Sequence, residues 1–144
     1  MTTQGAGKRA RDVMHAGAQC VGEHDSLRTA AQMMRDMDVG ALPICGDDDR
    51  LKGIITDRDI VIKCIAEGGD VDQMTARELA HGLVWCDAET SVEDALVKME
   101  EHKIKRMPVI ENHRIVGMIS EADLAKELPD SKLAEFVHRV YSGA

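Results

Sequence analysis

The sequence of 144 residues contains two copies of one pattern, and this internal repeat constrains the fold more than any other feature. A shift of 65 positions places Ser26 on Ser91 and aligns most of residues 20–51 with residues 85–115. VGALPIC then falls on IKRMPVI, and after a one-residue deletion LKGIITDRDI falls on IVGMISEADL. The aligned positions include Pro43 with Pro108, Gly53 with Gly117, Thr56 with Ser120 and Asp59 with Asp123.

Each copy predicts the same order of elements: strand, helix, strand, strand, helix. In the first copy, Ser26 is a suitable N-cap, and apolar residues recur at helical spacing through SLRTAAQMMRDMD. ALPIC and LKGIIT predict a hairpin closed by GDDDR, and DRDIVIKCIAEGG predicts a helix that ends at Gly68 and Gly69. The second copy repeats this plan, and the amphipathic stretch DSKLAEFVHRVYSGA follows it. The expected fold class is α/β (α+β), built from two β-α-β-β-α repeats.

Four segments are expected along the chain: a disordered N-terminus, two repeats and a C-terminal helix. Their bounds are 1–8, 9–70, 71–129 and 130–144. With one Trp, one Tyr and one Phe, the core is expected to be aliphatic, with nine Met filling gaps.

The repeated pattern resembles the paired cystathionine-beta-synthase (CBS) repeats: apolar-Pro-apolar-apolar, a polar turn, then Gly-apolar-apolar-(Ser/Thr)-x-x-Asp. The resemblance covers almost the whole chain, and TDRDI in a stand-alone pair is similar to small bacterial members such as the actinobacterial hypoxic response protein. It implies two repeats packed sheet to sheet about a pseudo-twofold axis, with two clefts that take adenine nucleotides. Candidate ligands are AMP, ADP, ATP and S-adenosylmethionine.

The Thr56-Asp57-Arg58-Asp59 segment carries the nucleotide hypothesis for the first copy. A strand gives way to a helix here, so the Thr56 hydroxyl and nearby backbone N–H groups lie where anions are favoured. Asp59, one turn later, can accept hydrogen bonds from two ribose hydroxyls. The alternative is that the hydroxyl and the carboxylate only cap the helix.

Ser120 and Asp123 offer the same pair of groups in the second copy. The resemblance implies that the phosphate end of each cleft comes from the residues just before the Pro strand of the opposite repeat. These residues are Lys105 and Arg106 in the second copy, but Gly40 and Ala41 in the first. The cleft of Thr56 and Asp59 is therefore expected to prefer phosphorylated ligands. The alternative is that the two cations only balance acidic neighbours.

The overall charge bears on partners and location. A net charge of -8 and a pI near 5.2 argue against a nucleic-acid partner, which normally requires a basic face. The sequence has no run of about 18 apolar residues, so no membrane span is expected. MTTQGAGKRA lacks the apolar core of a signal peptide, and a cytoplasmic location is expected.

No catalytic motif and no local metal-ligand motif is present, so neither an enzyme nor a metal cofactor is expected. The chain lacks a Gly-x-Ser-x-Gly elbow, a P-loop and a Gly-x-Gly-x-x-Gly turn, and its six His form no H-x-x-x-H pair. His15 and His81 hold matching places ahead of the first strand of each copy, and such a pair could capture zinc in a crystal.

Four cysteines lie far apart with no C-x-x-C pair, and they are expected to be reduced and mostly buried. Cys20 and Cys45 are the exception to consider. A strand-helix-strand crossover usually places its two strands side by side, which makes a disulfide geometrically feasible.

The function expected from these features is regulatory: a module that binds adenine nucleotide-type ligands in clefts between the repeats and signals through an unknown protein partner. The alternative is a stress-associated interaction protein that keeps the fold and binds no nucleotide. A homodimer is expected, because family dimers bury the second helix of each repeat. Those helices carry Val61, Ile65, Leu124 and Leu128.

Overall fold

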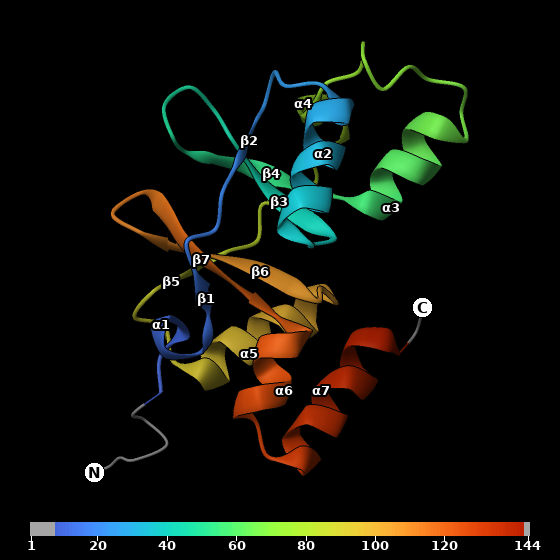
Figure 1. Ribbon diagram of the computed structural model, residues 1–144. Helices are drawn as coiled ribbons and strands as arrows, with labels where there is room; N and C mark the ends of the chain where they lie inside the picture. Colours follow the sequence, from blue (N-terminus) through green and yellow to red (C-terminus); the bar gives the residue numbers. More distant parts are fainter. Residues whose placement is uncertain (1–7, 143–144) are drawn as a thin grey trace. The chain divides into compact units, whose positions relative to one another are not determined.

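The computed structural model describes residues 8–142, and the chain forms two compact units (Figure 1). The first-repeat unit contains residues 18–83, and the second-repeat unit contains residues 8–17 together with 84–142. Of the expected disordered N-terminus at 1–8, only Lys8 is among the described residues. Residues 8–17 belong to the second-repeat unit, and this placement matters for the site because His15 lies among them.

The first-repeat unit is built on a three-stranded sheet in the order β2-β3-β4, with β2 parallel to β3 and β3 antiparallel to β4. The strands ALPIC and LKGIIT have the bounds expected from the sequence, and the helix after β4 begins as α-helix and continues as π-helix. The elements are β2 (Val21–Gly22), α2 (Leu27–Met37), β3 (Ala41–Cys45), β4 (Leu51–Thr56), α3 (Asp57–Asp59), η2 (Ile60–Ile65) and α4 (Ala76–Leu79).

The second-repeat unit repeats this plan and adds a fourth strand and a final helix. Its sheet has the order β1-β7-β6-β5, and the added strand β1 pairs antiparallel with β7. The elements are α1 (Ala10–Val13), β1 (His15–Ala16), β5 (Cys86–Asp87), α5 (Val92–His102), β6 (Arg106–Glu111), β7 (Arg114–Ser120), α6 (Glu121–Glu127) and α7 (Asp130–Tyr141). Both units mix helices with a sheet, so the expected fold class is confirmed.

The repeat extends to the helix caps. Ser26 Oγ accepts from the Thr29 backbone N–H at 3.1 Å, and Ser91 Oγ accepts from the Asp94 backbone N–H at 3.1 Å. At the other end, α2 and α5 both stop at a residue in the left-handed conformation, with φ of 55° and 53°. The local sequence therefore sets where these two helices begin and end.

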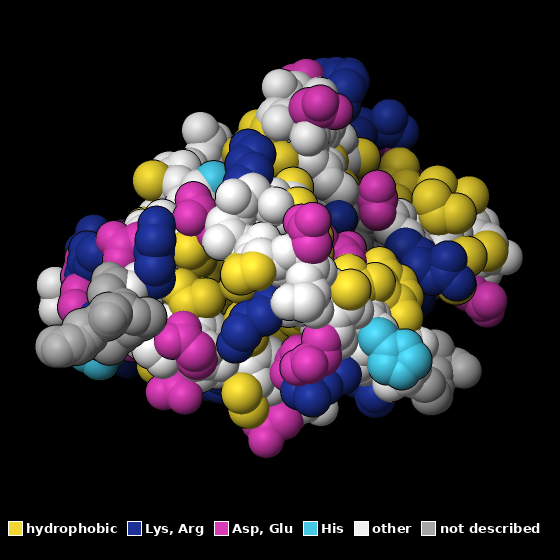
Figure 2. Space-filling model, turned by 90° about the horizontal axis from the view of Figure 1, so that it is seen from below, with side chains coloured by type: hydrophobic (Ala, Val, Ile, Leu, Met, Phe, Trp, Pro, Cys, Tyr) yellow, Lys and Arg dark blue, Asp and Glu magenta, His cyan; other side chains and the backbone are white. Residues whose placement is uncertain are grey.

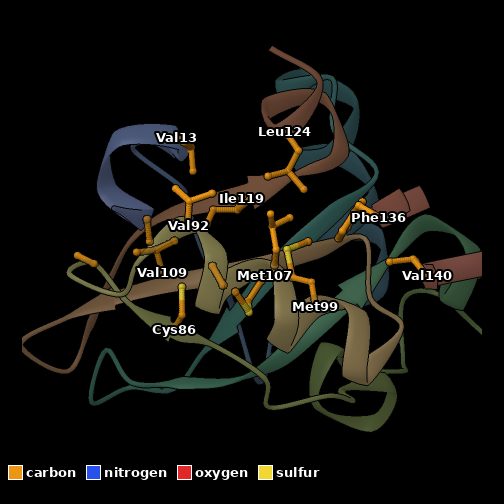
Figure 3. Close-up of a cluster of buried hydrophobic side chains, with 14 residues drawn as sticks. Val13, Cys86, Val92, Met99, Met107, Val109, Ile119, Leu124, Phe136 and Val140 are labelled. Carbon is orange, nitrogen blue, oxygen red and sulfur yellow. The ribbon is translucent and has the colours of Figure 1, made fainter. Parts of the chain in front are cut away.

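Each unit has its own aliphatic core. In the second-repeat unit, the side chains of α5, β6, β7 and α6 meet the inner face of α7, where Phe136 has no exposed surface (Figure 3). In the first-repeat unit, Leu27 and Ile44 are fully buried. No helix in residues 8–142 is long and apolar enough to cross a membrane.

The cysteine expectation needs a correction. Cys20 and Cys45 form a disulfide with Cα atoms 5.6 Å apart, because β2 and β3 are neighbouring strands as the crossover predicts. Only Cys64 and Cys86 are free thiols, and both are buried. Burial raises the pKa of Cys86 to about 11, so its thiol is protonated and unreactive at neutral pH.

Candidate functional site

A closed capping box joins Thr56 and Asp59 where β4 gives way to α3. The Asp59 carboxylate accepts from the Thr56 backbone N–H at 2.9 Å and from the Thr56 hydroxyl at 2.8 Å. In return, Thr56 Oγ1 accepts from the Asp59 backbone N–H at 3.1 Å. These bonds fix the carboxylate at the helix start and satisfy donors that a helix start leaves open.

Ser120 and Asp123 build the same box in the other unit. The Asp123 carboxylate accepts from the Ser120 backbone N–H and hydroxyl, both at 2.9 Å. The Asp123 backbone N–H donates to Ser120 Oγ at 3.3 Å. The capping interpretation is therefore correct for both copies, and each box also presents a fixed carboxylate.

A histidine meets each of these carboxylates. His81 Nε2 lies 2.8 Å from Asp59 Oδ2, and His15 Nδ1 lies 2.7 Å from Asp123 Oδ2. The two histidines hold matching places in the repeat. The sequence shows that match, but not that each ring reaches the carboxylate of a capping box.

The aligned glycines explain how the histidines come so close. His15 pairs across the β1–β7 ladder with Met118, and an isolated bridge pairs His81 with Ile54 at the corresponding place on β4. A Cβ added to Gly117 would lie 2.7 Å from the His15 carbonyl oxygen. At Gly53 an added Cβ would lie 3.0 Å from the Cβ of Ala80, the residue before His81. Each glycine thus leaves room for the histidine-bearing segment.

Asp59 is the more enclosed of the two aspartates. It is 7% exposed, and Lys63 Nζ lies 3.2 Å from its second carboxylate oxygen. Burial by itself raises the pKa of Asp59, but hydrogen bonds from His81 and Thr56 outweigh it and hold the pKa below its ordinary value. Asp59 is therefore a carboxylate at neutral pH.

The other expected site residues of the first-repeat unit lie near its capping box. Ala41 pairs with Thr56 across the β3–β4 ladder, and the Gly40 carbonyl accepts from the Asp57 backbone N–H at 2.9 Å. Arg58 is exposed in the first turn of α3.

In the second-repeat unit, Arg106 is the first residue of β6 and pairs across the ladder with Ser120. Lys105 is exposed, and its Nζ lies 4.6 Å from the centre of the Tyr141 ring. Arg106 is exposed as well. Both cations expected to meet phosphate are thus open to solvent, as an anion site requires.

The metal-binding capacity of the described residues is limited to pairs of ligands. Within residues 8–142, no group of three or more His, Cys, Asp and Glu side chains is arranged to hold a metal ion. The two His–Asp pairs each offer one imidazole nitrogen and one carboxylate, which is half of a tetrahedral zinc site. Water or further protein ligands would have to supply the rest.

The pattern of residues and the repeated β-α-β-β-α units are matched by a known family. The family model described as "CBS domain" matches residues 10–65 and 76–130. The chain belongs to the CBS-domain family. Hypoxic response protein 1 of Mycobacterium tuberculosis is 54% identical over 134 residues, which make up 92% of this chain and 94% of that protein.

Solved CBS structures agree with this assignment. The crystal structure of Hypoxic Response Protein I (HRPI) with two coordinated zinc ions is 56% identical, with a TM-score of 0.79, and covers 85% of this chain and all of that one. A hexameric CBS-CP12 protein from bloom-forming cyanobacteria is 26% identical, with a TM-score of 0.73, over 83% of this chain and 67% of that one. This CBS pair is therefore related to a stress-associated protein and has a fold that occurs in oligomers.

The zinc ions of HRPI correct the expectation that a protein of this kind has no metal cofactor. A search of the sequence for ligands a few residues apart could not detect pairs such as these. His15 and Asp123 are separated by 108 positions, and His81 and Asp59 by 22. The one available signal was the matching position of the two histidines in the repeat.

Proposed function

We propose that this CBS pair is a regulatory binding module without catalytic activity, whose ligand is an adenine nucleotide. The observation that carries the proposal is the capping box built twice, each time with an aspartate held at a helix start. Asp59 would accept the ribose hydroxyls, and Lys105 and Arg106 would contact the phosphate. Binding would be passed on through a protein partner.

The geometry supports these roles in different ways. The Asp59 carboxylate is ionised and held in place, so little conformational entropy is lost when it accepts a ribose. Lys105 and Arg106 are exposed, and charge-assisted contacts to phosphate contribute about 1.5–3 kcal/mol each. The expected preference for phosphorylated ligands therefore rests on Arg106 more than on Asp59.

Calorimetric titration of AMP and adenosine separates the two roles. Arg106→Ala is expected to weaken AMP by about tenfold or more and to leave adenosine almost unchanged, since adenosine has no phosphate. Asp59→Asn is expected to weaken both ligands. Asp123→Asn is the matched control, because it alters the same box in the other repeat.

Equal losses of AMP and adenosine in Arg106→Ala would show that the arginine is only surface charge. If neither AMP nor adenosine gives a heat of binding with the unaltered protein, the other function is favoured: a stress-associated interaction protein that keeps the CBS fold and binds no nucleotide. The name of Hypoxic response protein 1 is compatible with either function. The cytoplasmic location stays a prediction, which cell fractionation can test.

Zinc is the second candidate ligand, favoured by the two His–Asp pairs and by the two zinc ions of HRPI. Two ligands of a tetrahedral zinc ion lie about 3.3 Å apart for bonds of about 2.0–2.1 Å. The pairs here are closed by hydrogen bonds of 2.7 and 2.8 Å, so a metal ion requires each to open by about half an ångström. The donors fit zinc, which would hold the two side chains together as a structural or regulatory ion.

Metal analysis after dialysis against zinc tests this second candidate. The unaltered protein is expected to retain two equivalents, and His15→Gln and His81→Gln one each. His138→Gln, an exposed histidine on α7, is the control and should retain both. Two equivalents in both single variants would rule out the His–Asp pairs as ligands.

A further inference from the structure

An apolar pocket lies between α1, α5 and the start of α7 in the second-repeat unit. It has a volume of about 280 Å³, and we call it the α1–α5–α7 pocket. Its walls are formed by Val13, Val92, Leu96, Leu128 and Pro129, and Figure 3 labels the first two. Figure 2 shows hydrophobic side chains exposed among acidic and basic ones on one face of the molecule.

The repeat includes the segment that leads into α1, and this shows what the pocket is shaped to hold. RARDVMH at 9–15 falls on TARELAH at 75–81. The Leu27 backbone N–H, at the start of α2, donates to the Met74 carbonyl at 2.9 Å. The Val92 backbone N–H, at the start of α5, donates to the Lys8 carbonyl at 3.2 Å. Lys8 therefore has the place in the second-repeat unit that Met74 has in the first.

The Met74 side chain fills the corresponding space of the first-repeat unit. It packs against the core, and a Cβ added to Gly69 would lie 2.8 Å from Met74 Sδ and 3.2 Å from Cys64 Sγ. Cys64 aligns with Leu128 of the pocket wall. The Lys8 side chain instead is 60% exposed and pairs with a carboxylate of α6 at 3.3 Å. The pocket is thus the space that a methionine fills in one repeat and a solvent-facing lysine leaves open in the other.

The residues before Lys8 offer no replacement for the methionine. Residues 71–73 of the first repeat, Val-Asp-Gln, align with residues 5–7, Gly-Ala-Gly, which lie outside the described residues. None of these three has a side chain larger than a methyl group. The long apolar side chain that would complete the pocket therefore has to come from elsewhere.

The charge at the rim of the pocket is reversed between the repeats. In the first-repeat unit, Arg28 on α2 donates to the Asp72 carboxylate at 3.0 Å, and Asp72 lies two positions before Met74. Arg28 aligns with Glu93, which is exposed on α5. Among the described residues, the Glu93 side chain forms no ion pair. A segment bound in this place therefore needs a cation where the first repeat has Asp72.

We propose that the α1–α5–α7 pocket binds an extended segment of a partner protein, whose methionine or leucine side chain enters the pocket while a lysine or arginine two positions earlier pairs with Glu93. The template is the segment 71–74 of this chain, with its acidic residue exchanged for a basic one. The net charge of -8 also favours the approach of a basic partner. Lys132 of the rim lies on α7, which has no counterpart in the first repeat, so the template gives it no role.

Nuclear magnetic resonance titration of the full chain with short peptides tests the contact, without nucleotide or zinc. The probe is a peptide of residues 70–75 with Asp72→Lys, and it is expected to bind with a dissociation constant below about 1 mM. The peptide that keeps Asp72 should bind about fivefold or more weakly, because its carboxylate meets Glu93. The probe with Met74→Ala should bind about tenfold or more weakly, because less apolar surface is buried.

Equal affinities of the three peptides, or no binding of the probe, would overturn the proposal. Hexylamine, which combines an alkyl chain with a cation, is the small-molecule control. If hexylamine binds as tightly as the probe, the pocket is a site for small molecules and not for a protein segment.

Charge reversal on the protein tests the role of Glu93. Glu93→Arg should reverse the preference, so that the peptide with Asp72 binds more tightly than the probe. Asp94→Arg is the matched control, because Asp94 is the next exposed residue of α5 and does not line the pocket, and it should keep the original preference. An unchanged preference in Glu93→Arg would show that this carboxylate does not meet the segment. Thermal unfolding checks that each variant is folded.

Filling the pocket from within tests its equivalence to the space around Met74. Lys8→Met is expected to raise the midpoint of thermal unfolding by about 2–4 °C and to weaken the probe by about tenfold or more. Lys8→Gln removes the same charge without adding a long apolar side chain, and it should do neither. An unchanged midpoint together with unchanged binding in Lys8→Met would contradict the proposal.

Discussion

Replacing Asp59 by Asn removes one negative charge from the best-enclosed carboxylate while keeping the shape of its side chain. The amide oxygen of the new side chain would still accept one hydrogen bond from the Thr56 backbone, so the helix start remains capped. What is lost is the charge that attracts His81 and Lys63, at 2.8 and 3.2 Å. Hydrogen bonds to a charged group contribute about 1.5–3 kcal/mol.

The expected loss of unfolding free energy is about 2 kcal/mol at pH 7. The loss is expected in the lower half of the range of about 1.5–3 kcal/mol, because the His81 and Lys63 side chains are 47% and 52% exposed. Both side chains can form hydrogen bonds with water when the carboxylate is removed. The pKa of Asp59 lies below its ordinary value of 3.8 in the folded chain. Its stabilisation is therefore complete above 3.8 and disappears as the pH falls through the lower folded pKa.

Urea unfolding followed by far-UV circular dichroism, from about pH 7 to pH 3, measures this difference. Asp123→Asn is the matched variant and should lose only about 1 kcal/mol, because Asp123 is more exposed and the counterpart of Lys63 is Glu127. Trp85, the single tryptophan, lies in the second-repeat unit and reports that unit separately. An equal loss from Asp59→Asn at every pH would refute the reasoning, because the effect would then come from shape and not from charge.

Two further predictions concern the scaffold. Phe136→Ala should lower the unfolding free energy by about 3–5 kcal/mol, because Phe136 is fully buried, while Val137→Ala, at a site 38% exposed, should cost under about 1 kcal/mol; thermal unfolding compares the two. Cys20→Ser should lower the stability by about 3 kcal/mol through loss of the link across 25 positions to Cys45, and reducing agent should destabilise the unaltered protein but not this variant in urea titrations.

Features that depend on neighbouring residues could be predicted from the amino-acid sequence. The repeat fixed the order of strands and helices, and the hydroxyl at each helix start forms the expected cap at Ser26, Ser91, Thr56 and Ser120. The bounds of β3 and β4 are those of ALPIC and LKGIIT. These features follow from hydrogen bonds and side-chain periodicity within a few residues, which one sequence records directly. The short helices α1 and α4 were missed because four residues carry too little periodicity to detect.

Contacts between side chains that are far apart in the sequence became visible in the folded chain. The Cys20–Cys45 bond joins positions 25 apart, and the His15–Asp123 pair joins positions 108 apart. The repeat places α6 and the α3–η2 helix in equivalent positions, yet α7 covers one and leaves the other exposed. The reason is that burial depends on what the rest of the chain packs against a helix face, and two segments at equivalent places in a repeat can differ in that respect.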